Sequence, residues 1–156
     1  MEEPAWEHEL ERCYASVLRA LLAVAGSREP AEDAMQEAIM ALLQHGPTDV
    51  RRLDGWLYVV GVRALGRSRW KQRLLSPLRE VSAWSPAPGV ERVHAIELLR
   101  HLTPRQRAFV TARYYLDWSY DEIARQFEVS TATATSTVTQ SLAKLRRRLR
   151  EDSDER

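Results

Sequence analysis

Cysteine and long apolar runs are the two features that this sequence has least of. Cys13 is the single cysteine in 156 residues, so no disulfide forms within the chain, and no Cys and His residues have the spacing of a zinc site. The longest apolar runs, such as residues 20–25, are much shorter than the roughly 20 residues that cross a bilayer. The start of the chain is acidic where an export signal would be basic. We therefore expect a cytoplasmic protein with no metal and no membrane insertion.

Sequence signatures of an active site are also missing. No glycine-rich phosphate-binding loop is present, and the four histidines lie apart with no nucleophile or metal-ligand pattern around them. These histidines are His8, His45, His94 and His101. We expect a protein that is not an enzyme, with no catalytic residue and no cofactor.

The net charge of the chain is small, but the charged residues are unevenly distributed along it. The formal net charge is only +1. Residues 1–50 nevertheless hold 3 basic and 10 acidic residues, whereas residues 51–73 hold 7 basic residues and one acidic residue, Asp54. This asymmetry indicates two surfaces of opposite sign with different partners. The alternative is that each charge run is simply the solvated face of a helix.

A proline-rich stretch divides the sequence in two. Residues 74–92 contain Ser76-Pro77, Ser85-Pro86 and Pro88-Gly89 and show no helical period. Proline biases the preceding residue toward extended conformations, so we predict an extended linker here. The predicted domains are residues 1–73 and residues 93–156, on either side of this linker.

Helical periodicity accounts for the first domain. Apolar residues recur at helical spacing from Leu10 to a stop near Gly26, then from Pro30 to Gln44, then from Asp54 to Arg73. The second of these helices is acidic on its polar face, and the third is basic in its later turns. We predict a small three-helix bundle.

Capping signals organise the second domain. Thr103 precedes Pro104 and can form a capping box with Gln106, and Ser119 and Ser130 are placed to cap two further helices. The last two helices are separated by a turn of three residues, which is typical of a helix-turn-helix that offers its second helix to the DNA major groove. The predicted fold class is therefore all-α, with a helical bundle and a helix-turn-helix domain joined by an extended linker.

The residues named so far resemble the extracytoplasmic-function group of sigma factors in the sigma-70 superfamily. The likeness covers nearly the whole chain. It is carried by residues 32–38 and 55–58, which resemble region 2 of that family, and by residues 102–107, Tyr114, 119–124, 129–130 and 145–146, which resemble region 4. Each segment is weak by itself, whereas their order and spacing make the joint match specific.

The resemblance implies a sigma factor that binds core RNA polymerase and directs it to promoter DNA. It implies docking on the clamp helices of the β′ subunit and on the β flap, and an anti-sigma factor as a candidate partner. In this sequence the clamp-docking role falls on the acidic helix, at Glu32, Asp33, Gln36 and Glu37. Carboxylates on one helix face suit a cationic partner helix.

The third helix would bind the minus-10 element and keep its non-template strand single-stranded. Separated bases need aromatic platforms and a cationic groove. The candidates are Tyr58, Arg63, Arg67, Arg69, Trp70, Lys71 and Arg73. Trp56 lies on the apolar stripe and is better explained as a core residue. The usual Asn and Asp of the family's helix are replaced by Arg63 and Arg67, so base preference does not carry over.

The last helix would read the minus-35 element with an unusual sequence. Residues 130–140 read STATATSTVTQ and carry no charge. Hydroxyls can bond base edges, and arginines elsewhere would have to contact the phosphates. The candidates are Arg105, Arg107, Arg113, Ser130, Thr131, Thr133, Thr135, Ser136, Thr137, Arg146, Arg147 and Arg148. Glu128 lies in the turn where the family often has Gly, which predicts strain if that residue has a positive φ.

Two other functions remain open at this point. A helix-turn-helix transcription regulator would bind duplex DNA alone as a dimer, with the bundle sensing a ligand or dimerising. A degenerate, sigma-like protein would bind polymerase without reading a promoter.

Overall fold

A computed structural model describes residues 5–46, 52–75 and 90–156, and the side chains of residues 69–75 and 90–94 are not described. The chain divides into two compact units, residues 1–85 and 86–156, which are described separately below. Residues 76–89, which make up most of the predicted linker, lie outside the described residues.

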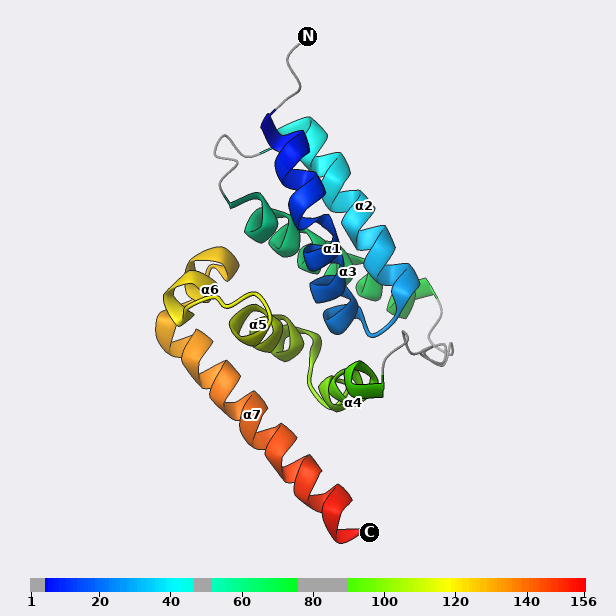
Figure 1. Ribbon diagram of the computed structural model, residues 1–156, viewed down its shortest axis with the longest axis vertical. Coiled ribbons are helices and arrows are strands. Elements are labelled where there is room, and N and C mark those ends of the chain that lie inside the picture. The colour runs from blue at the N-terminus through cyan, green and yellow to red at the C-terminus, as the bar shows by residue number, and fades with distance from the viewer. Residues whose placement is uncertain (1–4, 47–51, 76–89) are drawn as a thin grey trace. The chain divides into compact units, whose positions relative to one another are not determined.

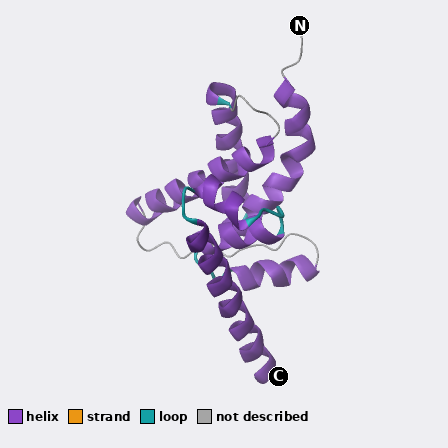
Figure 2. Cartoon of the chain, turned by 90° about the vertical axis from the view of Figure 1, so that its left-hand side faces the viewer, coloured by secondary structure: helices purple, strands orange, loops and turns teal. Residues whose placement is uncertain are grey.

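The described residues form helices and connecting loops with no strand, which confirms the all-α prediction (Figures 1 and 2). The first unit contains α1 (Ala5–Ala25), α2 (Arg28–His45) and α3 (Leu53–Leu75). The second contains α4 (Val90–Leu99), α5 (Pro104–Tyr114), α6 (Tyr120–Phe127) and α7 (Thr131–Asp154). Helix α4 was not predicted, because its first residues follow the proline-rich stretch directly and no capping residue precedes them.

Each of the three helices in the first unit packs against both of the others. Its core is mainly aliphatic and includes Val17 and Leu21 of α1, Met35 of α2 and Leu57 of α3, with the buried ring of Tyr58 next to Leu57 in the sequence of α3. A Cβ added at Gly61 would lie 2.7 Å from a δ-methyl group of Leu21, so α1 and α3 approach closely where α3 has no side chain. Burial of this apolar surface stabilises the bundle by roughly 25 cal/mol per Å².

The turn between α1 and α2 depends on a glycine. Gly26 has φ +79°, a left-handed conformation that glycine adopts without the steric penalty of a Cβ atom. Its backbone N–H donates to the carbonyl of Leu22 at 2.9 Å and closes the end of α1.

Cys13 is a buried part of the first unit and has no reactive role. Burial is the main cause that raises the pKa of its thiol to about 11, and the nearby carboxylates of Asp54 and Glu9 add to the shift. Because the thiolate is the reactive form, a thiol with this pKa stays protonated and inert near neutral pH. Cys13 therefore acts as a small hydrophobic residue.

Side-chain caps begin three helices of the second unit, as the sequence predicted. Thr103 accepts from the N–H of Gln106 at 3.2 Å, and the amide oxygen of Gln106 accepts from the N–H of Thr103 at 2.9 Å. Ser119 caps α6 and Ser130 caps α7 by accepting backbone N–H bonds of 3.1 Å and 3.0 Å. Such caps stabilise a helix by about 1 kcal/mol each.

The core of the second unit is built around aromatic rings. The rings of Phe109 in α5 and Phe127 in α6 lie 5.0 Å apart, and Trp118 in the intervening loop lies 6.4 Å from Phe127. Ala134 and Val138 of α7 are fully buried. This core holds α6 and α7 as the two helices of a helix-turn-helix.

Candidate protein and nucleic-acid interfaces

The outer face of α2 carries the predicted acidic residues. Asp33, Gln36 and Glu37 are exposed and Glu32 is half-buried at the edge of the same face. The opposite face packs into the bundle through residues that include Ala31, Ala34, Met35, Ala38 and Leu42. The helical repeat therefore places the four predicted residues together on one exposed surface.

The same face becomes apolar in its later turns. Met40 is 59% exposed and Leu43 is 62% exposed, one and two turns after Gln36. Sequence analysis missed both residues, because an isolated apolar residue on a helix is usually assigned to the core. Their spacing from Asp33 and Gln36 was the available signal.

One ion pair joins the acidic helix to the basic helix. The guanidinium of Arg67 in α3 donates to the Glu37 carboxylate at 2.8 Å. Both side chains are more than half exposed, at 59% and 53%, so we expect this pair to contribute between 0 and 1 kcal/mol. Arg28 and Glu32 form a second exposed pair at 2.8 Å within α2. Among the described residues, Asp33 has no such ion pair.

The basic helix exposes fewer aromatic groups than predicted. Arg63 and Arg67 are exposed, as a nucleic-acid surface requires. Tyr58 has 0% of its surface exposed, so in this structure it is not an open platform for a base. The expected apolar stripe consists of residues 56, 57, 60 and 64 and does not include Tyr58, whereas Leu57 and Tyr58 are both buried in the structure.

The remaining residues of the predicted minus-10 surface are placed only in part. Trp56, expected in the core, is half-buried. The backbone of α3 continues through the other four candidates, whose side chains lie outside the described residues. These are Arg69, Trp70, Lys71 and Arg73.

Two of the three arginines of α5 are structural, which corrects their assignment as phosphate contacts. Arg107 is only 7% exposed and donates from Nη1 to the Leu102 carbonyl at 3.2 Å. Arg113 is half-buried and donates from Nη1 to the Trp118 carbonyl at 3.3 Å, which fixes the loop between α5 and α6. Only Arg105 of this set is exposed.

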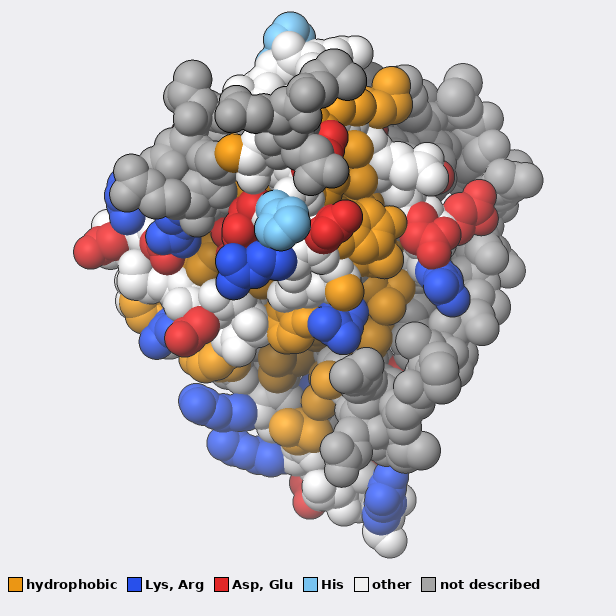
Figure 3. Space-filling model, turned by 45° about the horizontal axis from the view of Figure 1, so that its top comes forward, with side chains coloured by type: hydrophobic (Ala, Val, Ile, Leu, Met, Phe, Trp, Pro, Cys, Tyr) orange, Lys and Arg blue, Asp and Glu red, His pale blue; other side chains and the backbone are white. Residues whose placement is uncertain are grey.

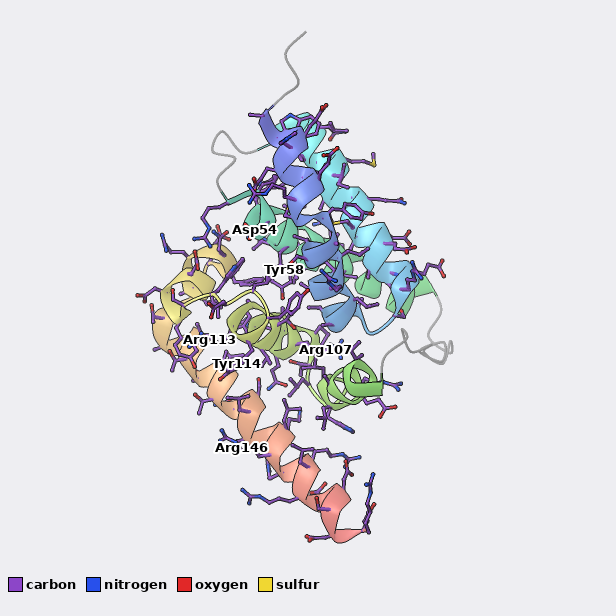
Figure 4. The ribbon with its side chains drawn as sticks, viewed as in Figure 1. Asp54, Tyr58, Arg107, Arg113, Tyr114 and Arg146 are labelled. Carbon is purple, nitrogen blue, oxygen red and sulfur yellow. The ribbon has the colours of Figure 1, made fainter. Side chains whose placement is uncertain are left out.

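Aromatic contacts reinforce the structural role of Arg113. Its guanidinium lies 5.6 Å from the ring centre of Tyr114 and 5.2 Å from that of Tyr120, both within cation–π range. Figure 4 labels Arg113 and Tyr114 near the end of α5. Charge counting along the sequence does not distinguish an arginine held in this way from a solvated one.

The predicted reading residues of α7 fall into two groups. Ser130, Thr131, Thr135 and Ser136 are exposed, whereas Thr133 and Thr137 are half-buried against the domain. Within residues 131–140, three further residues are exposed and were missed: Ala132, Thr139 and Gln140. A period of 3.6 residues counted from the buried Ala134 and Val138 would have identified them.

The C-terminal arginines lie far from the first turns of α7. Arg146 is 15 residues beyond Thr131, which is about 22 Å along a helix at 1.5 Å per residue (Figure 4). Arg146 and Arg147 are exposed, whereas Arg148 is bound to two neighbours in this unit. It donates to His101 Nε2 at 3.3 Å and to the Glu151 carboxylate at 3.3 Å.

On the face drawn in Figure 3, described acidic and basic side chains lie interleaved with apolar ones. At the turn between α6 and α7, a shallow hollow is lined by Asp121, Ala124, Arg125, Val129, Ser130 and Thr131.

No group of three or more His, Cys, Asp or Glu side chains that could hold a metal occurs in the described ranges. Within the same ranges, no helix is long and apolar enough to cross a bilayer.

Comparison with known proteins gives two findings. Residues 94–145 match the family model of sigma-70 region 4. The fold is similar to that of the sigma factor RpoE from Bartonella quintana, solved in complex with the anti-sigma factor NepR. The TM-score is 0.77 with 19% sequence identity, and the match covers 92% of this chain and 96% of that chain. No curated protein matches this chain.

Proposed function

We infer that this chain, a sigma-70 family protein with the fold of a solved sigma factor, serves RNA polymerase as a sigma factor of the extracytoplasmic-function type. The observation that carries the inference is the region 4 match over residues 94–145, which includes α5, α6 and α7 as far as residue 145. The sigma-70 family consists of regulators that have no catalytic activity of their own, and we propose the same for this chain.

We propose a division of labour between residues 1–73 and residues 93–156. The first domain binds core polymerase and handles the minus-10 element, and the second recognises the minus-35 element. The exposed acidic face of α2 suits a cationic helix such as the β′ clamp helices. Region 4 would also contact the β flap. A protein with these partners acts in the cytoplasm.

The basic helix α3 supplies the surface for the separated strand at minus 10. Arg63 and Arg67 are exposed there and can neutralise phosphates. Arg69, Trp70, Lys71 and Arg73 continue the same helix and would extend this surface. The similar sigma factor is bound by an anti-sigma factor, and we propose that a protein of that class also controls this chain.

The test of the acidic face is a charge reversal at Asp33. Because Asp33 is exposed and forms no ion pair with another described residue, Asp33→Lys leaves the internal ion pairs of the bundle intact. We expect Asp33→Lys to weaken binding to bacterial core polymerase at least about tenfold, measured by titration of the fluorescently labelled chain. Glu11→Lys is the matched control, since Glu11 is exposed on α1 and the charge change is the same.

Equal affinities for the two variants would show that α2 is not the docking surface. The function itself is tested by transcription of genomic fragments with core polymerase. New transcripts should require the chain, and their absence from every fragment would contradict the proposal.

A protein that binds polymerase without reading a promoter is the second candidate. The neutral first turns of α7 and the buried Arg107 favour it, because both reduce the charge offered to DNA. It predicts full affinity for core polymerase and no promoter-specific transcript. A helix-turn-helix regulator would instead bind duplex DNA as a dimer without polymerase.

A further inference from the structure

The hydroxyl groups of the first two turns of α7 use their protons inside the protein. A serine or threonine hydroxyl has one proton to donate and two lone pairs that accept. Thr131 donates to the carboxylate of Asp121 at 3.0 Å. Thr135 donates to the backbone carbonyl of Thr131 at 2.9 Å, and Ser136 donates to that of Thr133 at 3.2 Å. These bonds direct the three protons away from solvent.

The capping residue of α7 follows the same pattern. Ser130 donates from its hydroxyl to Thr133 Oγ1 at 2.8 Å and accepts from the Thr133 N–H at 3.0 Å. The hydroxyls of Ser130, Thr131, Thr135 and Ser136 therefore all donate to protein atoms, whereas that of the half-buried Thr133 accepts from Ser130. What the exposed side chains of this face offer outward is oxygen lone pairs and methyl groups.

Exposure and charge define the extent of this neutral face. Thr131, Ala132, Thr135 and Ser136 are all exposed, and residues 130–140 carry no charge. The exposed amide of Gln140 lies nine residues beyond Thr131, about 13 Å further along the helix. The neutral face is therefore the exposed part of residues 131–136, and it holds no Arg, Lys, Asn or Gln.

The base edges of the major groove differ in what they need from such a face. Adenine N6 and cytosine N4 present amino donors, thymine presents a methyl group, and guanine presents only the acceptors N7 and O6. An amino group can be bonded by an outward lone pair with every internal bond of α7 retained. Bonding guanine would require a hydroxyl to break its internal bond first, so one bond would replace another with little net gain.

We propose that the exposed side chains of Thr131, Ala132, Thr135 and Ser136 read promoter DNA only as hydrogen-bond acceptors and methyl groups, and so select adenine or cytosine amino groups and thymine methyl groups, never guanine acceptors. This inference rests on the proposed function, because it describes how the same helix reads the minus-35 element. It states which chemical groups of the bases are read and assumes no particular promoter sequence.

The experiment begins with selection of a minus-35 sequence. Holoenzyme reconstituted from core polymerase and the full chain is incubated with duplexes in which only the minus-35 segment is randomised, and bound duplexes are sequenced. The selected duplex is then remade with deoxyuridine for thymine, purine without the amino group for adenine, or 7-deazaguanine for guanine. We expect deoxyuridine or the purine without an amino group to lower the affinity of the holoenzyme about fivefold or more at one or more positions. We expect 7-deazaguanine to change that affinity less than about twofold.

Two variants connect the effect to individual hydroxyls. Thr135→Val keeps the methyl group and removes the acceptor, so it should retain sensitivity to deoxyuridine and reduce sensitivity to the missing amino group. Ser136→Ala should also reduce sensitivity to the missing amino group. Ser153→Ala is the matched control, since Ser153 donates to the Leu149 carbonyl at 2.9 Å in the same kind of back-bond at the far end of α7.

The outcomes distinguish failure of the proposed promoter recognition from failure of acceptor-only reading by α7. If no minus-35 sequence is enriched, helix α7 does not read DNA, and the proposed promoter recognition fails together with this inference. If a sequence is enriched but binding depends on guanine N7, promoter recognition stands and this inference is overturned. Unchanged amino-group sensitivity in both Thr135→Val and Ser136→Ala would overturn it as well.

Discussion

Arg67 in the first unit and Arg107 in the second are both arginines on amphipathic helices, yet the two units use them differently. Arg67 is 59% exposed and meets an exposed carboxylate, whereas Arg107 is 7% exposed and donates to a backbone carbonyl. The first unit keeps its charges on the surface, where a partner can reach them. The second draws Arg107 and Arg113 into its fold and leaves the uncharged residues 130–140 at the start of α7 largely exposed.

The same contrast extends to how the two units are held together. The first unit packs three long helices through mainly aliphatic side chains and one close approach at Gly61. The second joins three short helices and the long α7 by three side-chain caps and an aromatic core. The first unit should therefore respond most to changes of side-chain volume, and the second to changes of turn and cap geometry.

The largest effect that we expect comes from filling the close approach in the first unit. Gly61→Val places a branched side chain where a Cβ atom alone lies 2.7 Å from Leu21, and we expect a loss of about 2–3 kcal/mol in the free energy of unfolding. Urea titration followed by circular dichroism measures it.

Gly66 is the matched control for this change. It lies on the same helix with nothing within 4 Å of an added Cβ atom. Gly66→Ala should stabilise the protein by about 0.5–1 kcal/mol, because alanine has the higher helix propensity. Gly66→Val places the same side chain as Gly61→Val at the open position. Equal losses in the free energy of unfolding for these two variants would show that α1 and α3 do not pack tightly at Gly61.

A smaller effect should come from the turn of the helix-turn-helix in the second unit. The sequence predicted strain at Glu128 only if its φ were positive; its φ is 56°, and a residue with a Cβ atom is strained there by about 1 kcal/mol. Glu128→Gly and Glu128→Ala both remove the carboxylate. The glycine variant should therefore be the more stable of the two by about 1 kcal/mol in thermal unfolding, and the opposite order would contradict strain in this turn.

The helices and caps were predictable from the sequence because they depend on local chemistry. Thr103, Ser119 and Ser130 each precede an apolar period, and all three cap as expected. The left-handed conformation of Glu128 was left open by the sequence, which indicated only strain if its φ were positive. Helix α4 was not predicted, since no cap or clear period distinguishes its start.

The candidate site was predictable only where it depends on one helix face. The acidic residues of α2 lie together because a single helical period decides their placement. Tyr58, Arg107 and Arg113 were assigned to DNA by residue type, but tertiary packing decides their exposure. A sequence shows which residues carry charge, whereas partners such as the Trp118 carbonyl appear only after folding.

The smallest effect concerns the ion pair between Glu37 and Arg67. A double-mutant cycle with Glu37→Gln and Arg67→Gln should give a coupling of about 0.5 kcal/mol in urea unfolding at low salt, since both groups are largely exposed. The coupling should disappear at 1 M salt, where the screening length is about 3 Å. Arg28 and Glu32, which meet at the same 2.8 Å within α2, provide the control cycle.

A weak pair at this position matters for how the two surfaces of the first unit work. Glu37 belongs to the proposed polymerase surface and Arg67 to the proposed DNA surface, so each partner would have to compete with this ion pair. A coupling near 0.5 kcal/mol changes an equilibrium by only about twofold, which leaves both groups available. A coupling above about 2 kcal/mol that persists at 1 M salt would contradict this, because the first unit would then hold its charges as firmly as the second unit holds Arg113.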